Sequence, residues 1–466
     1  MNTFKNKVLP IAVVGGGFSG TLTAIHLSRR LADVPIILFE EGCEAGPGLA
    51  YQASDSGACL NIPAGKMSAF AELPDHFIDY ARKATDESVR PGDFLPRSLY
   101  GKYLKDCLAN AMAENPLLKV DRRRVVDVTG IEENGAARII LKDLTGLDVA
   151  MVVLASGNQG SAFSSSVWAS QTVSAHDLTA IENVGEGESV MIVGSGLTMI
   201  DTVLGLVRSG RVGTIHAISR HGLLPKPYAP ADELKAPDLD YLPDSNLRKS
   251  LYLFRKVIRD HQSNGGNWRD IFAAIRSATP SLWQELSPRD KGRFLRFLSP
   301  FWEVHRHQCA PDAFAAIQDL IETGRLVLHR GTIVSVDKQS NGKRVGLGAK
   351  SREAATEWIE AAHLFDASGP ARDINTATHP LIRNLLRRGF LNPDAHRLGA
   401  ETAVDYRALG RGGQPSNWLY IVGPMLRARY FEATAVHELR LHAAAVAARV
   451  EARYRSNHLE LAPVPV

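Results

Sequence analysis

The chain has 466 residues, which corresponds to about three domains at roughly 150 residues each. Its 54 basic and 50 acidic residues give a formal net charge of +4. This argues against a general nucleic-acid-binding protein, because such a protein would carry a dense basic face. Hydrophobic residues make up 45% of the chain and charged residues 22%, a composition that excludes a disordered chain and provides a core of normal size.

The first predicted unit covers residues 9–40. An apolar run at residues 9–14 predicts a buried strand, residues 21–30 predict a helix, and residues 35–39 predict a second strand. The turn between the first strand and the helix fits the pattern G-x-G-x-x-G, and an acid follows the second strand, 20 residues beyond the last glycine. The spacing predicts a dinucleotide site formed by Gly15, Gly17, Phe18, Ser19, Gly20 and Glu40.

Each glycine of this turn has a distinct physical task. Gly15 allows the tight turn, Gly17 lets the backbone approach a pyrophosphate, and Gly20 lets the helix pack closely on the strand. The helix N-terminus then offers free N–H groups to the phosphates. A glycine turn without a ligand is the alternative, but the strand, helix and acid at these spacings favour a nucleotide whose ribose is unphosphorylated, as in FAD.

The middle of the chain contains a second dinucleotide pattern. Residues 124–129, 138–141 and 149–154 predict a small antiparallel meander that returns to a strand, and residues 190–193 predict another buried strand. The turn after that strand contains Gly194, Gly196, Leu197 and Thr198 but lacks a third glycine. The next strand, residues 214–218, is followed by Ser219 and Arg220 with no carboxylate. This favours NADPH, with Arg220 binding the 2′-phosphate, although a merely solvated arginine is the alternative.

The remaining elements complete an α/β fold. Residues from about 230 to 310 lack strand patterns and predict a helical lobe, including helices at 247–260 and 268–277. Residues 327–337 and 361–369 return to strand patterns, and residues 432–454 predict a long helix. We expect two Rossmann-type domains in a doubly wound α/β architecture. The FAD domain would be discontinuous, residues 1–180 and 330–466, and the NADPH domain with its lobe would be residues 181–330.

Cysteine usage and apolar stretches bear on location. No two of Cys43, Cys59, Cys107 and Cys309 form a C-x-x-C pair, so a disulfide framework, a zinc site and dithiol exchange are all disfavoured. The apolar run at residues 8–14 ends in glycines and not in a signal-peptide cleavage site, and glycines interrupt the run at residues 189–207. We expect a cytoplasmic protein without a membrane partner.

Blocks along almost the whole chain resemble flavin-containing and N-hydroxylating flavoprotein monooxygenases and, most closely, the bacterial FAD/NAD(P)-binding oxidoreductases related to them. The blocks include residues 48–51, 60–68, 94–97, 219–225, 302–307 and 431–435. Two Ala-Ser-Gly turns, at residues 155–157 and 367–369, are similar to the Ala-Thr-Gly turns of these flavoproteins. With this resemblance we expect further cofactor contacts at Met67, Arg97, Val126, Ala155, Gly157 and Gly369.

Three residues are candidates for chemistry, and the resemblance suggests the first of them. Asn61 is followed by Lys66 and Met67, a context similar to the one that places an asparagine beside the reactive flavin. An amide there could stabilise a flavin hydroperoxide, or it could satisfy loop backbone. His305 and Arg306 could contact substrate or nicotinamide, although packing of the lobe is the stronger interpretation, and they make poor metal ligands. We expect no metal.

Two departures limit what the resemblance implies. The F-x-G-x-x-x-H signature is missing near residues 163–176, which puts ketone oxygenation in doubt. Pro424 follows Gly423 where many of these flavoproteins have Asp, so a flavin contact by a carboxylate cannot be transferred.

The expected activity is therefore NADPH-dependent reduction of FAD followed by oxygenation of a soft nucleophile through a flavin hydroperoxide. The nucleophile would be the nitrogen of an amino acid or amine, so a small-molecule substrate and molecular oxygen are the expected partners. A flavin oxidoreductase without oxygen insertion and a non-catalytic redox sensor remain alternatives. The substrate and the oligomeric state stay open.

Overall fold

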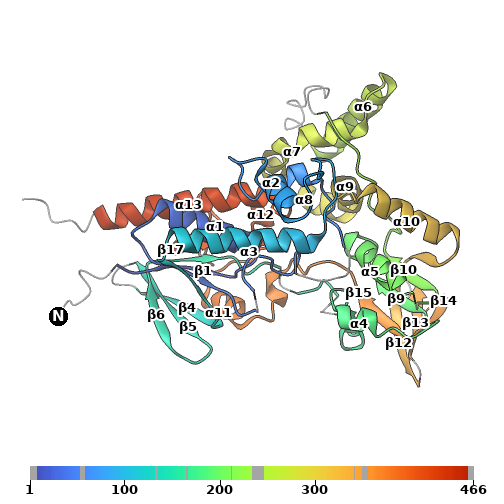
Figure 1. Ribbon diagram of the computed structural model, residues 1–466, viewed down its shortest axis with the longest axis horizontal. Helices are drawn as coiled ribbons and strands as arrows, with labels where there is room; N and C mark the ends of the chain where they lie inside the picture. Colours follow the sequence, from blue (N-terminus) through green and yellow to red (C-terminus); the bar gives the residue numbers. More distant parts are fainter. Residues whose placement is uncertain are drawn as a thin grey trace, which may run out of the picture. The chain divides into compact units, whose positions relative to one another are not determined.

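The computed structural model describes residues 8–42, 44–52, 58–131, 135–158, 160–163, 166–210, 212–232, 246–340, 342–348, 355 and 357–459. The chain divides into two compact units (Figure 1). The first comprises residues 1–53, 64–160 and 372–466, and the second comprises residues 54–63 and 161–371.

The first unit is built on a six-stranded sheet. Its strand order is β16 (Arg407–Leu409), β17 (Pro415–Ile421), β7 (Met151–Leu154), β1 (Ile11–Val14), β2 (Ile36–Phe39) and β3 (Leu118–Asp121). All neighbouring pairs are parallel except the edge pair β16–β17. The predicted strands β1 and β2 are confirmed, and every residue of β1 is buried because both faces of the sheet are covered.

Helices cover one face of this sheet, and a small sheet with α11 (Pro380–Arg388) packed on it covers the other (Figure 1). The first-unit helices are α1 (Phe18–Arg30), α2 (His76–Ala84), α3 (Arg97–Glu114), α11 (Pro380–Arg388), α12 (Arg427–Tyr430) and α13 (Val436–Leu459). The small sheet is the predicted antiparallel meander, β4 (Val125–Ile131), β5 (Ala136–Leu141) and β6 (Gly146–Val149). A single residue separates β6 from β7, which is why the sequence pattern merged the two strands. The long helix predicted at residues 432–454 begins at Val436 and ends at Leu459.

The second unit is built on a five-stranded parallel sheet. Its order is β11 (Leu326–Arg330), β10 (Ile215–Ser219), β9 (Val190–Val193), β15 (His363–Asp366) and β8 (Val173–Ser174). Alternation along β9 divides its side chains between two cores. Ile192 packs in the core with α4 (Leu178–Glu182), α5 (Leu197–Arg208) and α10 (Pro311–Glu322), while Met191 packs against a second, antiparallel sheet.

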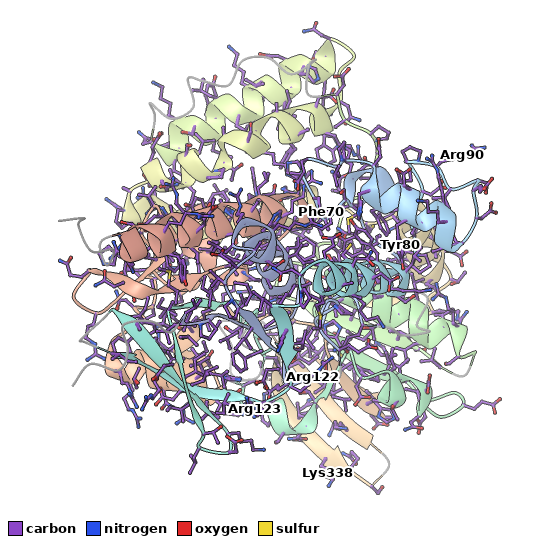
Figure 2. All side chains as sticks on the ribbon, turned by 60° about the vertical axis from the view of Figure 1, so that its left-hand side comes forward. Phe70, Tyr80, Arg90, Arg122, Arg123 and Lys338 are labelled. Atoms are coloured by element: carbon purple, nitrogen blue, oxygen red, sulfur yellow. The ribbon has the colours of Figure 1, made fainter. Side chains whose placement is uncertain are left out.

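That antiparallel sheet consists of β12 (Thr332–Gln339), β13 (Gly342–Gly348) and β14 (Glu357–Ala361). Figure 2 shows Lys338 at its outer end. The predicted doubly wound α/β fold is confirmed for both units. Short 3₁₀ turns at Ala64–Lys66, Ala169–Gln171, Ile374–Thr376 and Pro424–Leu426 connect the larger elements.

The expected domain boundaries were wrong at three places, the shortest of which is residues 54–63, a segment of the second unit that the expected FAD domain had included. Residues 331–371 belong to the second unit, because β15 pairs with β9 and β8, and because Val336 and Val345 share a core with Met191. Residues 161–180 belong there too, through β8. The sequence pattern at residues 327–337 had suggested one strand, whereas the chain forms β11 and then, after Gly331, enters a different sheet as β12.

The predicted helical lobe is confirmed over its described part. It contains α6 (Leu247–Ser263), α7 (Trp268–Glu285), α8 (Pro288–Arg293), a π-helical turn (Phe294–Leu298) and α9 (Ser299–Arg306). Residues 233–245 of the predicted lobe lie outside the described residues. Among the helices that the structure describes, none combines the length and apolar composition needed to cross a membrane.

One buried carboxylate organises the lobe. Asp270 accepts hydrogen bonds from His261 Nε2 at 2.9 Å, from the Asn267 N–H at 3.0 Å and from the Asp232 N–H at 2.9 Å. Burial alone would raise the pKa of the Asp270 carboxyl, but these hydrogen bonds together hold the pKa below its usual value. The carboxylate therefore stabilises the fold in its charged form.

We expect Asp270→Asn to lower the free energy of unfolding by about 2–4 kcal/mol at neutral pH, because an amide group would oppose donors in a buried site. A carboxyl pKa that is lowered in the folded state stabilises the fold above its unfolded pKa and loses this effect as the pH falls. The difference in the free energy of unfolding between Asp270→Asn and wild type should therefore shrink as the pH falls. Thermal denaturation between neutral and acid pH measures this, with the exposed Asp260→Asn as control; a difference that is constant with pH would contradict it.

Candidate functional site

The first predicted glycine turn joins β1 to α1 in the first unit. Gly15 has φ +106°, and a Cβ there would collide with the carbonyl oxygen of Ala155, the residue that follows β7. A Cβ on Gly20 would collide with the carbonyl oxygen of Gly15. Both positions therefore require glycine, one for its backbone conformation and both for space.

The start of α1 provides donors for an anion. Gly17 is the N-cap and makes no side-chain capping hydrogen bond, so the first turn, Phe18, Ser19 and Gly20, keeps the N–H groups that no helical carbonyl can accept. Among the described residues, a Cβ on Gly17 would meet only Gly48, at 3.6 Å. The backbone is thus open at the point where a pyrophosphate would lie. This cradle fits a dinucleotide.

Glu40 closes the turn at the end of β2. Its Oε2 accepts a hydrogen bond from the Gly16 N–H at 2.7 Å and its Oε1 accepts one from the Gly42 N–H at 2.8 Å. The carboxylate is therefore fixed beside the glycine turn, and its remaining lone pairs can accept ribose hydroxyls. The next residue, Glu41, forms an ion pair with Arg124 at 3.2 Å. This ion pair holds the beginning of β4, which contains Val126, beside the end of β2.

The other residues predicted to contact FAD are also in the first unit. Gly157 follows β7 with φ +66°, and Met67 is buried after the first 3₁₀ turn. Burial raises the pKa of the Tyr51 phenol to about 12. The positive charge of Arg97, the first residue of α3, partly opposes this rise. The Tyr51 ring lies 6.5 Å from the ring of Phe18. The structure thus connects Arg97 through Tyr51 to the glycine turn.

The second unit repeats the turn between β9 and α5. Gly194 has φ +118°, and a Cβ there would collide with the carbonyl oxygen of Ala367, just as Gly15 faces Ala155. Gly196 is the N-cap of α5 without a side-chain capping bond, and Leu197 and Thr198 form the first turn. The missing third glycine therefore does not prevent the same geometry. Gly369, with φ +85°, follows the Ala367 turn and belongs to this unit.

The two turns differ where β10 ends. The Ser195 hydroxyl donates to Leu223 O at 2.6 Å and lies 2.8 Å from the Ser219 hydroxyl, which in turn accepts the Gly222 N–H at 3.0 Å. Hydroxyl groups thus hold the position that a carboxylate holds in the first unit. Arg220 follows Ser219 and is exposed.

Sequence reasoning missed two residues near Arg220. Arg330 lies directly opposite Ser219 in the β10–β11 pairing, and Phe301 of α9 lies 6.2 Å from the His221 ring. Both come from segments far along the chain, and only the sheet register or the lobe packing places them there. No local sequence pattern could have found them.

The three residues suggested for chemistry lie in the second unit. The Asn61 Nδ2 donates to Gln308 O at 3.2 Å. The His305 ring stacks on Phe272 at 5.4 Å and its Nδ1 hydrogen-bonds to Phe301 O at 2.7 Å. Arg306 is half-buried beside it. These contacts match the loop-bracing and lobe-packing alternatives, and a role in chemistry stays a proposal for all three.

Comparison with known proteins agrees with the geometry of the first unit. Residues 12–159, which contain β1, α1, β2 and the Ala155 turn, match the FAD-NAD(P)-binding family model. The Escherichia coli (strain K12) protein YdhS, which is uncharacterized, is 29% identical over 111 residues, 21% of this chain. That match spans only 20% of the length of YdhS.

Three solved structures resemble the whole chain. They are the FAD-bound cadaverine monooxygenase of Erwinia amylovora (TM-score 0.64, 15% identity, 99% of this chain and 97% of that one), the L-lysine 6-monooxygenase of Pseudomonas syringae (0.63, 15%, 98% and 100%) and the Kutzneria sp. 744 ornithine N-hydroxylase (0.61, 13%, 96% and 100%). At such identities the likeness shows the fold. The chain carries an FAD/NAD(P)-binding domain and has the two-domain fold of the N-hydroxylating flavin monooxygenases.

Proposed function

We propose that the protein is an FAD- and NADPH-dependent monooxygenase that hydroxylates a nitrogen atom of an amino acid or amine. The observation that carries this proposal is the pair of matching glycine turns with different ribose-facing residues. The turn with Glu40 suits the unphosphorylated ribose of FAD, and the turn with Arg220 suits the 2′-phosphate of NADPH. Two nucleotide sites of different preference imply two cofactors that exchange electrons.

The first unit would hold FAD by its backbone. The N–H groups of Phe18, Ser19 and Gly20 would face the pyrophosphate, and Glu40 would accept ribose hydroxyls. Arg97, Met67, Val126, Ala155 and Gly157 are the proposed further contacts. When bound, the flavin would accept a hydride from NADPH and activate oxygen.

The overall reaction would convert R–NH₂, O₂, NADPH and H⁺ into R–NHOH, water and NADP⁺. One oxygen atom enters the new N–O bond and the other leaves as water, with both electrons supplied by NADPH. A free amine nitrogen is a nucleophile that needs no covalent activation by a side chain. The protein's task would be to bind the amine in its neutral form and to exclude water.

Two observations favour oxygen over a dithiol as the electron acceptor. Burial raises the pKa of the Cys107 thiol to about 12 and that of Cys309 to about 11, so neither is nucleophilic at neutral pH. The structurally similar enzymes act on cadaverine, lysine and ornithine, all of which present an amine nitrogen. The described cysteines are free thiols, which supports a reducing compartment such as the cytoplasm.

The test is an electron balance. Purified protein loaded with FAD is mixed with NADPH in air, and NADPH loss, hydrogen peroxide and product mass are measured across a panel of amines and amino acids. We expect one class of amine to lower the peroxide yield and to gain the mass of one oxygen atom. Full recovery of electrons as peroxide with every amine would instead support the oxidoreductase without oxygen insertion. Absence of NADPH oxidation would support the redox sensor.

A further inference from the structure

Two arginines stand at the ends of adjacent strands of the second-unit sheet. Arg330 is the last residue of β11 and lies opposite Ser219, the residue before Arg220, at the end of β10. Gly222 comes so close to this strand that a Cβ on it would lie 3.5 Å from the Arg330 Cβ. Both arginines are exposed, and within the part of the chain that the structure describes, neither has an ion-pair partner.

This arrangement suits an anion. Two positively charged side chains stand at adjacent strand ends, and neither forms an ion pair with a described acid. The carboxyl ends of parallel strands are also where open α/β sheets bind ligands. Each guanidinium presents a planar set of N–H donors that matches two oxygens of a phosphate. A terminal phosphate, with two negative charges and three oxygens, fits a pair of arginines better than a single one.

The turn that carries Arg220 is held in place. Ser219 Oγ contacts Ser195 Oγ at 2.8 Å and accepts the Gly222 N–H at 3.0 Å, so the turn is closed on itself. Gly222 adopts φ +61°, which suits a glycine at a tight reversal. The turn therefore fixes the backbone direction of Arg220 and His221 before any ligand binds.

An exposed aromatic ring stands beside the same turn. Phe301 is 50% exposed, and its ring centroid lies 6.2 Å from that of His221. Its backbone carbonyl accepts a hydrogen bond from His305 Nδ1 at 2.7 Å within α9. The His305 ring in turn stacks on Phe272 of α7, which anchors this part of α9 to the lobe. A π-helical turn, Phe294–Leu298, directly precedes α9, and such turns are common at functional sites. An exposed phenyl ring next to an imidazole offers a surface on which a flat aromatic ligand can stack.

We propose that Arg330 joins Arg220 in binding the 2′-phosphate of NADPH, and that Phe301 and His221 hold its adenine ring. The adenosine end of the cofactor thus has two separable parts, a phosphate part at the ends of β10 and β11 and an adenine part supplied by the lobe. This inference rests on the proposed function only in taking NADPH as the ligand.

Substitutions in the two parts should differ in how they change the affinities for 2′,5′-ADP and 5′-ADP. Arg330→Met removes the charge and keeps much of the stem, so it should weaken binding of 2′,5′-ADP by about tenfold or more and leave 5′-ADP nearly unchanged. Phe301→Ala should weaken both nucleotides alike, by about three- to tenfold, because both contain adenine. Phe301→Trp should restore most of that affinity.

Calorimetry on the FAD-loaded full chain measures these affinities without turnover. Arg325→Met is the matched control for Arg330, because this exposed arginine precedes the other end of β11. Phe297→Ala is the control for Phe301, because Phe297 is 58% exposed one helical turn earlier. Neither control should change either affinity by more than about twofold.

Each outcome decides the inference. An equal loss for both nucleotides in Arg330→Met, or no loss, overturns the phosphate part. Unchanged affinities in Phe301→Ala overturn the adenine part. Failure of 2′,5′-ADP to bind the wild type overturns both parts, whatever the enzyme produces. The expected affinities without any hydroxylated amine would instead leave the inference standing and overturn the proposed function.

Discussion

Replacing Gly15 with alanine is expected to yield protein that no longer retains FAD and is purified colourless. The added Cβ would lie closer than 3.0 Å to the Ala155 carbonyl, and the residue would have to keep φ +106°, which an alanine disfavours. The carbonyl belongs to the backbone after β7, a buried strand that cannot move aside. The turn must therefore open, and the N–H groups at the start of α1 lose their common direction. We expect FAD affinity to fall by at least about a hundredfold.

A second substitution separates ligand binding from folding. Gly17→Ala would place its Cβ in ordinary van der Waals contact with Gly48, so the ligand-free protein should keep its melting temperature. The methyl group would nevertheless occupy the side open to a pyrophosphate, and FAD affinity should still fall by about tenfold or more. Gly92→Ala is the control, because a Cβ on Gly92 would meet no described atom within 4 Å.

Fluorescence titration with FAD and thermal denaturation of the ligand-free protein are the two measurements. If Gly17→Ala bound FAD as tightly as Gly92→Ala while keeping its fold, the assignment of the first turn to the pyrophosphate would be wrong. If Gly15→Ala unfolded and Gly17→Ala kept its fold, the FAD affinity of Gly17→Ala would decide whether the first turn binds the pyrophosphate.

The parts of the site that could be predicted from sequence are those that depend on neighbours in the chain. The turn at Gly15, the acid Glu40 and the second turn at Gly194 are each set by a few consecutive residues, because turn geometry and strand burial are local properties. Even the irregular second turn, without its third glycine, keeps the same approach to a backbone carbonyl. Residue spacing therefore sufficed for both turns.

The domain boundary depends on pairing between distant strands and could not be found in this way. β15 joins β9 of the second unit, although more than 160 residues separate them along the chain, since β9 ends at Val193 and β15 begins at His363. The apolar sequence of a buried strand does not indicate which sheet the strand joins. Arg330 escaped notice for the same reason, because only the register with Ser219 places it at the site.

Residues transferred by resemblance behaved differently from residues derived from spacing. Asn61 and His305 matched blocks of similar sequence, yet the structure gives each a contact within the second unit, to Gln308 and to Phe301. A short block preserves a loop's shape as readily as a reaction, so it indicates fold more firmly than chemistry. By contrast, Glu40 followed from a physical requirement, and the structure places its carboxylate beside the turn.

Arg220→Ala is expected to raise KM for NADPH by about 10- to 100-fold while changing KM for NADH by less than about threefold. The two coenzymes differ only in the 2′-phosphate, so an interaction with that group must appear in one and not in the other. The size corresponds to the loss of a charge-assisted hydrogen bond pair, which is worth about 1.5–3 kcal/mol. Arg220 is exposed, and within the described part of the chain its side chain has no hydrogen-bond or ion-pair partner that its removal would disturb.

The reverse preference should follow from Arg220→Asp. A carboxylate at the end of β10 would repel the 2′-phosphate and could accept hydrogen bonds from the free ribose hydroxyls of NADH. The coenzyme preference is measured by reducing bound FAD anaerobically with each coenzyme and monitoring the flavin absorbance. This measurement does not depend on the amine substrate. Arg325→Ala controls for the loss of an exposed charge on the same unit. Equal effects of Arg220→Ala on both coenzymes would show that Arg220 does not bind the 2′-phosphate. A preference for NADPH would then have to come from other residues.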